Sequence, residues 1–157
     1  MNADRVVVRR ATRSDVPGLV TNYEWLFAPP GIRPPAWEGQ IAAKRLIETI
    51  EGTDSVLLVA EDSTGVVGFC SIYLDIESVR FGQRAWVEDL AVEPTYRSLG
   101  IGKRLLEAAK SWARSRNATH LKLDSGVSRV DAHRFYEREQ PTGRSNCYAW
   151  KLEAIGS

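Results

Sequence analysis

The chain has 157 residues, of which 43% are hydrophobic and 26% charged, with 12 glycines and 7 prolines. At roughly 150 residues per domain this length predicts a single domain, residues 1–157, and the composition excludes collagen-like, low-complexity and disordered proteins. The formal net charge of +1 provides no global field for binding a phosphate backbone, so nucleic acid is not an expected partner.

The cysteines, the histidines and the apolar runs exclude a disulfide framework, a metal site and a membrane-spanning segment. Cys70 and Cys147 are too few for a disulfide framework and lack zinc-site spacing, so we expect both to be reduced and buried. His120 and His133 show no metal-ligand pattern, and no metal is predicted. No stretch approaches the ~20 apolar residues of a membrane helix, and the N-terminal run Val6 to Val8 is too short for a signal peptide. We therefore predict a cytoplasmic protein with no membrane contact.

The first third of the chain changes from strand to helix. The β-branched run Val6 to Val8 predicts a short strand, and Thr12-x-x-Asp15 is typical of the capping box that opens a helix. Apolar side chains at helical spacing then predict two helices, over residues 16–27 and 36–50.

The rest of the chain alternates between the two types of element. Its periodicity predicts a hairpin, a strand, a helix, a strand, a helix and a final strand, over residues 55–60 with 66–75, 84–92, 100–116, 120–124, 131–139 and about 147–152. The order βααβββαβαβ predicts an α+β fold with a mixed central sheet of about six strands flanked by four helices. The final strand, with Tyr148 and Trp150, is an edge that could pair with a second chain, which would make a homodimer.

The candidate site is the strand over 84–92 followed by the turn Arg97-Ser-Leu-Gly-Ile-Gly102 and a helix. Glycines let the backbone approach a ligand closely, and the first N–H groups of a helix point outward at the positive end of its dipole. Such a cradle suits a pyrophosphate, and Arg97 and Lys103 could add charge-assisted contacts.

Two other phosphate loops do not match this turn. A dinucleotide fingerprint needs Gly or Ala where Leu105 stands, and a Walker loop needs four residues between its glycines and Ser or Thr where Arg104 stands. The pattern R-x-x-G-x-G, with L-A-V-x-P before it, instead resembles the acyl-CoA pyrophosphate loop of the GNAT (Gcn5-related) N-acetyltransferases. Residues 131–137 resemble the A-x-x-F-Y motif on the last helix of that family. Because the order of elements is also similar, the resemblance covers most of the chain.

This resemblance implies an N-acetyltransferase that takes the acetyl group from acetyl-CoA and passes it directly to an amine in a ternary complex. In the family the strand before the loop separates from its neighbour at a bulge, and the pantetheine pairs with backbone groups in the resulting slot. The residues that match the slot and the pyrophosphate loop here are Leu90, Ala91 and Val92, followed by Arg97, Ser98, Leu99, Gly100, Ile101, Gly102 and Lys103.

The resemblance also suggests catalytic residues. Tyr136 stands where the family has its usual general acid, which protonates the departing thiolate; alternatively it only packs beside Phe135. Strand alternation places Glu88 on the face of Leu90 and Asp89 on the opposite face. Glu88 matches the position of a histidine base in serotonin-type acetyltransferases, so we predict that it accepts the proton of the amine through a water. A carboxylate there could equally pair with an arginine or bind the ammonium, and Asp89 is the alternative base.

The acceptor is predicted to be a primary amine of a small molecule, such as an aminoglycoside, a polyamine, an amino acid or an aminophosphonate. Residues 131–139 resemble a segment of aminoalkylphosphonate acetyltransferases. A protein N-terminus or lysine is the alternative within the same chemistry. Arg129 and Gln140-Pro141 depart from the family pattern, which often has Asn and Gly-Phe there. These departures keep open a non-catalytic acyl-CoA-binding or sensing module.

Overall fold

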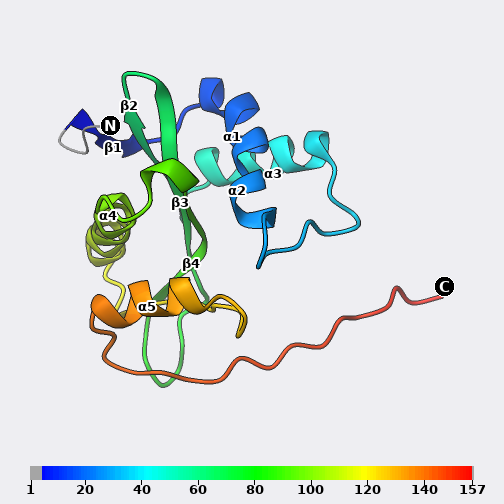
Figure 1. Cartoon of the computed structure of the whole chain (residues 1–157). Helices are drawn as coiled ribbons and strands as arrows, with labels where there is room; N and C mark the ends of the chain where they lie inside the picture. Colours follow the sequence, from blue (N-terminus) through cyan, green and yellow to red (C-terminus); the bar gives the residue numbers. More distant parts are fainter. Residues whose placement is uncertain (1–4, 157) are drawn as a thin grey trace. The chain divides into compact units, whose positions relative to one another are not determined.

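A computed structural model of the chain describes residues 5–156 (Figure 1). The chain divides into two units, the first ending at Leu123 and the second beginning at Asp124. The first unit contains a five-stranded sheet with helices on both faces, and the second contains one helix. Within the described residues, no helix is both long enough and apolar enough to cross a membrane.

The sheet of the first unit has its strands in chain order. They are β1 Val7–Arg10, β2 Ser55–Asp62, β3 Gly65–Leu74, β4 Arg84–Val92 and β5 His120–Lys122. The first three pairings are antiparallel, and β5 pairs parallel to β4. A parallel pair needs a crossover connection, which the helix α4, Ile101–Ser115, supplies. The predicted α+β fold with a mixed sheet is confirmed, with five strands in place of about six.

The helices of this unit cover the two faces of the sheet. The helices α1 Val16–Asn22, α2 Glu24–Phe27 and α3 Gly39–Glu51 lie on one side, and α4 lies on the other (Figure 1). The predicted capping box of Thr12 and Asp15 is present, and it opens a short 3-10 turn, η2 Arg13–Asp15. The single helix predicted over 16–27 is divided into α1 and α2 at Tyr23, whose side chain hydrogen-bonds to Asp89 of β4.

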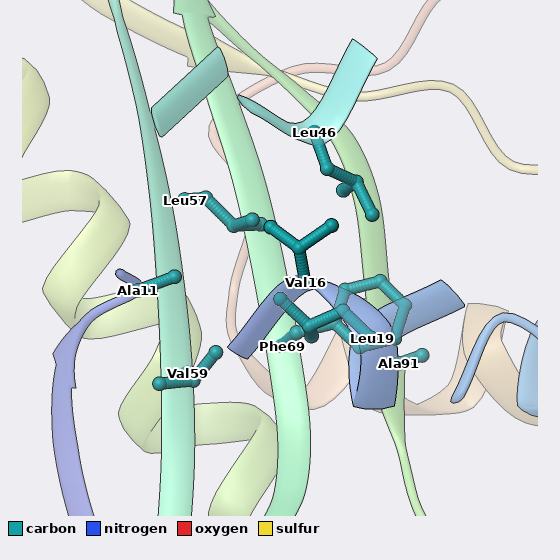
Figure 2. Close-up of a cluster of buried hydrophobic side chains, with 8 residues drawn as sticks. All are labelled: Ala11, Val16, Leu19, Leu46, Leu57, Val59, Phe69 and Ala91. Carbon is teal, nitrogen blue, oxygen red and sulfur yellow. The ribbon is translucent and has the colours of Figure 1, made fainter. Parts of the chain in front are cut away.

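Buried apolar side chains join α1 and α3 to the sheet (Figure 2). The cluster consists of Ala11, Val16, Leu19, Leu46, Leu57, Val59, Phe69 and Ala91. Leu19 and Phe69 are completely buried, and burial of a side chain of this size contributes about 1.5–3 kcal/mol. On the opposite face α4 packs closely against β3, since a Cβ on Gly68 would lie only 3.1 Å from Leu105 Cδ1.

The second unit corrects the prediction of a sixth strand. Its helix, α5 Val130–Arg138, begins one residue before the predicted start, but residues 141–156 form neither helix nor strand. Tyr148, Trp150 and Leu152 are 74%, 79% and 86% exposed, so the face that the alternation would bury stays in solvent. Cys147 lies in the same segment and is exposed, contrary to the expectation, whereas Cys70 is buried in β3.

Arg9 ties β1 to both β2 and the helix cap. Its Nη1 and Nη2 donate to Asp15 Oδ2 and Oδ1 at 2.8 and 2.9 Å, and its Nε and Nη2 donate to the two carboxylate oxygens of Glu61 at 2.8 Å. The hydrogen bonds from Arg9 outweigh desolvation and, with the Thr12 N–H, lower the pKa of Asp15 to about 2. One guanidinium therefore holds two carboxylates from separate elements.

This pairing predicts a pH-dependent effect of Asp15→Asn. A carboxyl group whose pKa is lowered by folding adds stability above its unfolded pKa of about 3.9, and that stability is lost as the pH falls towards about 2. We expect D15N to lower the free energy of unfolding by about 1–2 kcal/mol at neutral pH, measured by urea denaturation. The deficit should shrink as the pH falls from about 4.

The matched control is Asp131→Asn. Asp131 pairs with Arg134 at 2.8 Å, but its side chain is 92% exposed. We expect D131N to change stability by less than about 0.5 kcal/mol at any pH. A D15N deficit that stayed constant under acid conditions would contradict the role assigned to the Arg9 pair.

Candidate functional site

The strand β4 contains a bulge at Glu88. Ser71 of β3 lies opposite Asp89, but the next residue, Ile72, lies opposite Val87, so the register skips Glu88. An extra residue of this kind bends the strand and increases its twist, and bulges are frequent beside active sites. The sequence resemblance implied a bulge in this strand, and the structure contains one.

The bulge changes which side chains share a face. Residues opposite each other in a sheet lie on the same face. Through their partners on β3, Val87 and Leu90 lie on one face, while Asp89 and Ala91 lie on the face covered by α1 and α3. The predicted alternation holds from Asp89 to Val92 but is broken at Glu88, where the bulge adds one residue. Val87 therefore shares a face with Leu90, whereas strict alternation places the two on opposite faces.

β4 also leaves its second neighbour early. Its pairing with β5 covers only Arg84–Trp86, and β5 ends at Lys122. From Val87 to Val92, β4 continues beside β3 without β5 on its other side. A side of β4 that is not paired with β5 is where backbone pairing with an extended ligand is expected.

The chain passes from β4 through a short 3-10 turn, η3 Pro94–Tyr96, into the loop before α4. Ser98 and Gly100 adopt left-handed conformations, with φ of 66° and 83°. Gly100 is the N-cap of α4 and so offers no side chain to its first N–H groups, and a Cβ placed on it would meet nothing within 4 Å. The positive end of this helix is thus open on the side of the glycine, as anion binding requires.

Tyr96 anchors the start of this loop. Its ring is buried, and its hydroxyl donates to Asp62 at the end of β2. Hydrogen bonds from Thr64 and from Tyr96 lower the pKa of Asp62 to about 2, so the acceptor remains ionised at neutral pH. The loop therefore starts from a fixed point on the β2–β3 hairpin.

The residues predicted to hold a cofactor differ in burial. Arg97, Ser98, Leu99, Gly100 and Lys103 are exposed, Leu90, Val92 and Gly102 are half-buried, and Ala91 and Ile101 are buried. The buried residues can contribute backbone groups only. The Arg97 guanidinium lies 3.4 Å from the carbonyl oxygen of Val92 and 3.5 Å from that of Trp25, distances of weak hydrogen bonds.

The predicted catalytic residues lie in different units. Glu88 is exposed at the bulge of β4 and belongs to the first unit, together with the glycine loop. Tyr136 lies on α5 in the second unit, half-buried, with its ring centroid 5.2 Å from that of Phe135. No group of three or more His, Cys, Asp or Glu side chains within the described residues is arranged to hold a metal ion.

One residue of the site was missed by the sequence analysis. The hydroxyl of Tyr23 donates to Asp89 Oδ2 at 2.7 Å. The sequence places Tyr23 only among the apolar positions of a helix, and no motif marks it. Spacing along the chain could not reveal a contact between residues so far apart.

Comparison with known proteins points to one family. The family model described as "Acetyltransferase (GNAT) family" matches residues 20–140 of the chain. Over 93 residues the chain is 34% identical to an uncharacterised N-acetyltransferase of Bacillus subtilis, YhdJ, covering 59% of this chain and 65% of the relative. Over 74 residues it is 35% identical to the aminoalkylphosphonate N-acetyltransferase of Salmonella typhimurium, covering 47% of this chain and 48% of the relative.

A solved structure shares the fold. The aminoglycoside N-acetyltransferase AAC(6')-Iy, in complex with CoA, superposes with a TM-score of 0.81 at 12% identity, covering 95% of each chain. At this identity the likeness concerns the fold alone. The chain spans less than two thirds of the length of the two curated relatives, 65% and 48%.

Proposed function

Because the chain belongs to the acetyltransferase (GNAT) family, we propose that it transfers the acetyl group of acetyl-CoA to a primary amine of a small molecule. The observation that carries this proposal is the order of three structural features along β4, the loop after it and α4. β4 bulges at Glu88, leaves β5 after Trp86, and leads to the glycine-capped N-terminus of α4.

The residues of this segment fit acetyl-CoA. The stretch of β4 beyond Trp86 is not paired with β5, and its backbone groups on that side are the proposed partners of the pantetheine. Backbone N–H groups from Ser98 to Lys103, on the open side of Gly100, suit the pyrophosphate, and Arg97 and Lys103 add positive charge. The solved AAC(6')-Iy structure contains CoA in the same fold, which supports this assignment.

In the proposed reaction, acetyl-CoA supplies a thioester whose acetyl group moves directly to the acceptor. Glu88 accepts a proton from the ammonium through a water, which leaves a neutral amine to form the new C–N bond. Backbone N–H groups near Leu90 stabilise the negative charge on the carbonyl oxygen. As the C–S bond breaks, Tyr136 donates its proton to the thiolate, and the second proton that the attacking nitrogen loses on becoming an amide restores the Tyr136 phenol through solvent. The one proton released overall is the proton that Glu88 takes from the ammonium and returns to solvent. The role of Tyr136 rests on the family resemblance.

The acceptor class rests on the relatives. The relative from Salmonella typhimurium is named for aminoalkylphosphonates, and AAC(6')-Iy for aminoglycosides, both of which are small molecules with primary amines. A protein N-terminus or lysine remains the second acceptor class, because a relative of Bacillus subtilis, 28% identical, is named as a putative alanine N-acetyltransferase of a ribosomal protein.

The proposed function makes a prediction about acetyl-CoA binding. Gly100→Glu places an anion on the open side of the loop, whereas Gly100→Ala imposes a similar backbone strain at φ 83° without the charge. We expect calorimetric titration to show acetyl-CoA binding to the wild type, weaker binding to G100A, and none to G100E. Equal affinities of G100A and G100E for acetyl-CoA would show that this loop does not bind the negatively charged part of the ligand.

The proposed function also makes a prediction about the turnover of acetyl-CoA. Thiol release from acetyl-CoA, measured with aminoglycosides, polyamines, amino acids, aminophosphonates and lysine peptides, should identify an acceptor. With that acceptor, Glu88→Gln and Tyr136→Phe should each lower kcat by about 100-fold or more, while acetyl-CoA affinity stays within about twofold. Tight acetyl-CoA binding with no thiol release from any amine would instead identify a sensing module.

A further inference from the structure

Tyr23 connects the junction of α1 and α2 to the bulged strand. Its hydroxyl donates to Asp89 Oδ2 at 2.7 Å, and its ring centroid lies 5.0 Å from that of Phe69 and 5.3 Å from that of Trp37. Burial, together with the nearby charges of Asp89 and Glu88, raises the pKa of Tyr23. The phenol therefore keeps its proton at neutral pH and is a permanent hydrogen-bond donor to the carboxylate.

Ser71 holds the backbone of Asp89. It is a buried polar residue of β3, 7% exposed, and its Oγ accepts a hydrogen bond from the Asp89 N–H at 3.1 Å. Ser71 is also the last β3 residue before the register shifts. Asp89 is thus held through its side chain by the helices and through its backbone by the neighbouring strand.

This double attachment lies directly beside Glu88. On one side of the bulge Val87 is in register with Ile72, and on the other side Asp89 is in register with Ser71. Glu88 is the single residue between these two paired positions, so the pairing on either side restricts its backbone conformation. The backbone conformation at Glu88 therefore depends on where Asp89 is held.

We propose that Tyr23 and Ser71 are positioning residues that act through Asp89 to set the bulge presenting Glu88. In this assignment Asp89 is an anchor that accepts a hydrogen bond, and it is not the acceptor of the substrate proton. The inference rests on the proposed acetyl transfer. It assigns different roles to two carboxylates that are neighbours in the sequence.

The test uses the ability of asparagine to replace aspartate as an acceptor. Asp89→Asn keeps a side-chain oxygen for the Tyr23 hydroxyl, whereas Asp89→Ala removes it, and Tyr23→Phe removes the donor while keeping the ring. We expect kcat to fall by about 10- to 100-fold in Y23F and D89A, with the KM for acetyl-CoA within about twofold of the wild type. D89N should stay within about threefold, and the double variant Y23F/D89A should lose no more than D89A alone.

Two further measurements separate positioning from general loss of structure. Hydrogen exchange of the β4 amides should accelerate in Y23F, D89A and Ser71→Ala but not in D89N, with circular dichroism showing the fold intact. Ser71→Ala also serves if D89A does not fold. Tyr148→Phe, at a tyrosine that is 74% exposed, is the matched control and should leave kcat and exchange unchanged.

The outcomes distinguish the inference from the proposed function. An active wild type whose Y23F and D89A variants keep full kcat would overturn the positioning role and leave the function standing. A loss in D89N as large as that in D89A would identify Asp89 as the base and would also overturn the inference. A wild type that acetylates no amine would overturn the proposed function and, with it, the positioning role.

Discussion

The hydrogen-bond pairing of β4 is the constraint on which the candidate site depends. This strand pairs with β3 along almost its whole length but with β5 only over Arg84–Trp86. The first pairing holds the strand in the core, and the end of the second leaves one of its sides without β5. A register shift at Glu88 then adds a bulge where β4 has already left β5. A strand paired fully on both sides would offer no backbone groups to a ligand.

The packing on the two faces of the sheet places the glycine loop at the end of this strand. On one face, Ala91 joins the cluster around Phe69 and Leu19 (Figure 2). On the other, α4 approaches β3 at Gly68, where a side chain would leave only 3.1 Å to Leu105. Because interiors are close-packed, the position of α4 is determined by these contacts. The location of the α4 N-terminus therefore depends on core packing as well as on the loop.

The two neighbouring carboxylates of β4 illustrate how environment assigns roles. Glu88 is exposed at the bulge, whereas Asp89 is half-buried. The Asp89 carboxylate accepts a hydrogen bond from the Tyr23 hydroxyl, and its backbone N–H donates one to the Ser71 Oγ. Residue type alone gives no reason to treat them differently. Enzymes often separate the functions of two carboxylates by burial and hydrogen bonding, and the proposed roles of Glu88 and Asp89 follow that logic.

Local pattern in the sequence determined the strand over 84–92, the helix that follows, and the glycine loop between them. Each of these features depends on the spacing of residues within a short stretch of the chain. The same local pattern carried the resemblance to the family that the comparisons confirm. The resemblance implied a bulge in this strand, but only the tertiary structure decided its position at Glu88. The same holds for the hydrogen bond between Tyr23 and Asp89, which lie 66 residues apart. It also left residues 141–156 without a strand, although their alternation predicts one. Register, long-range hydrogen bonds and strand pairing all depend on a partner that the local sequence does not contain.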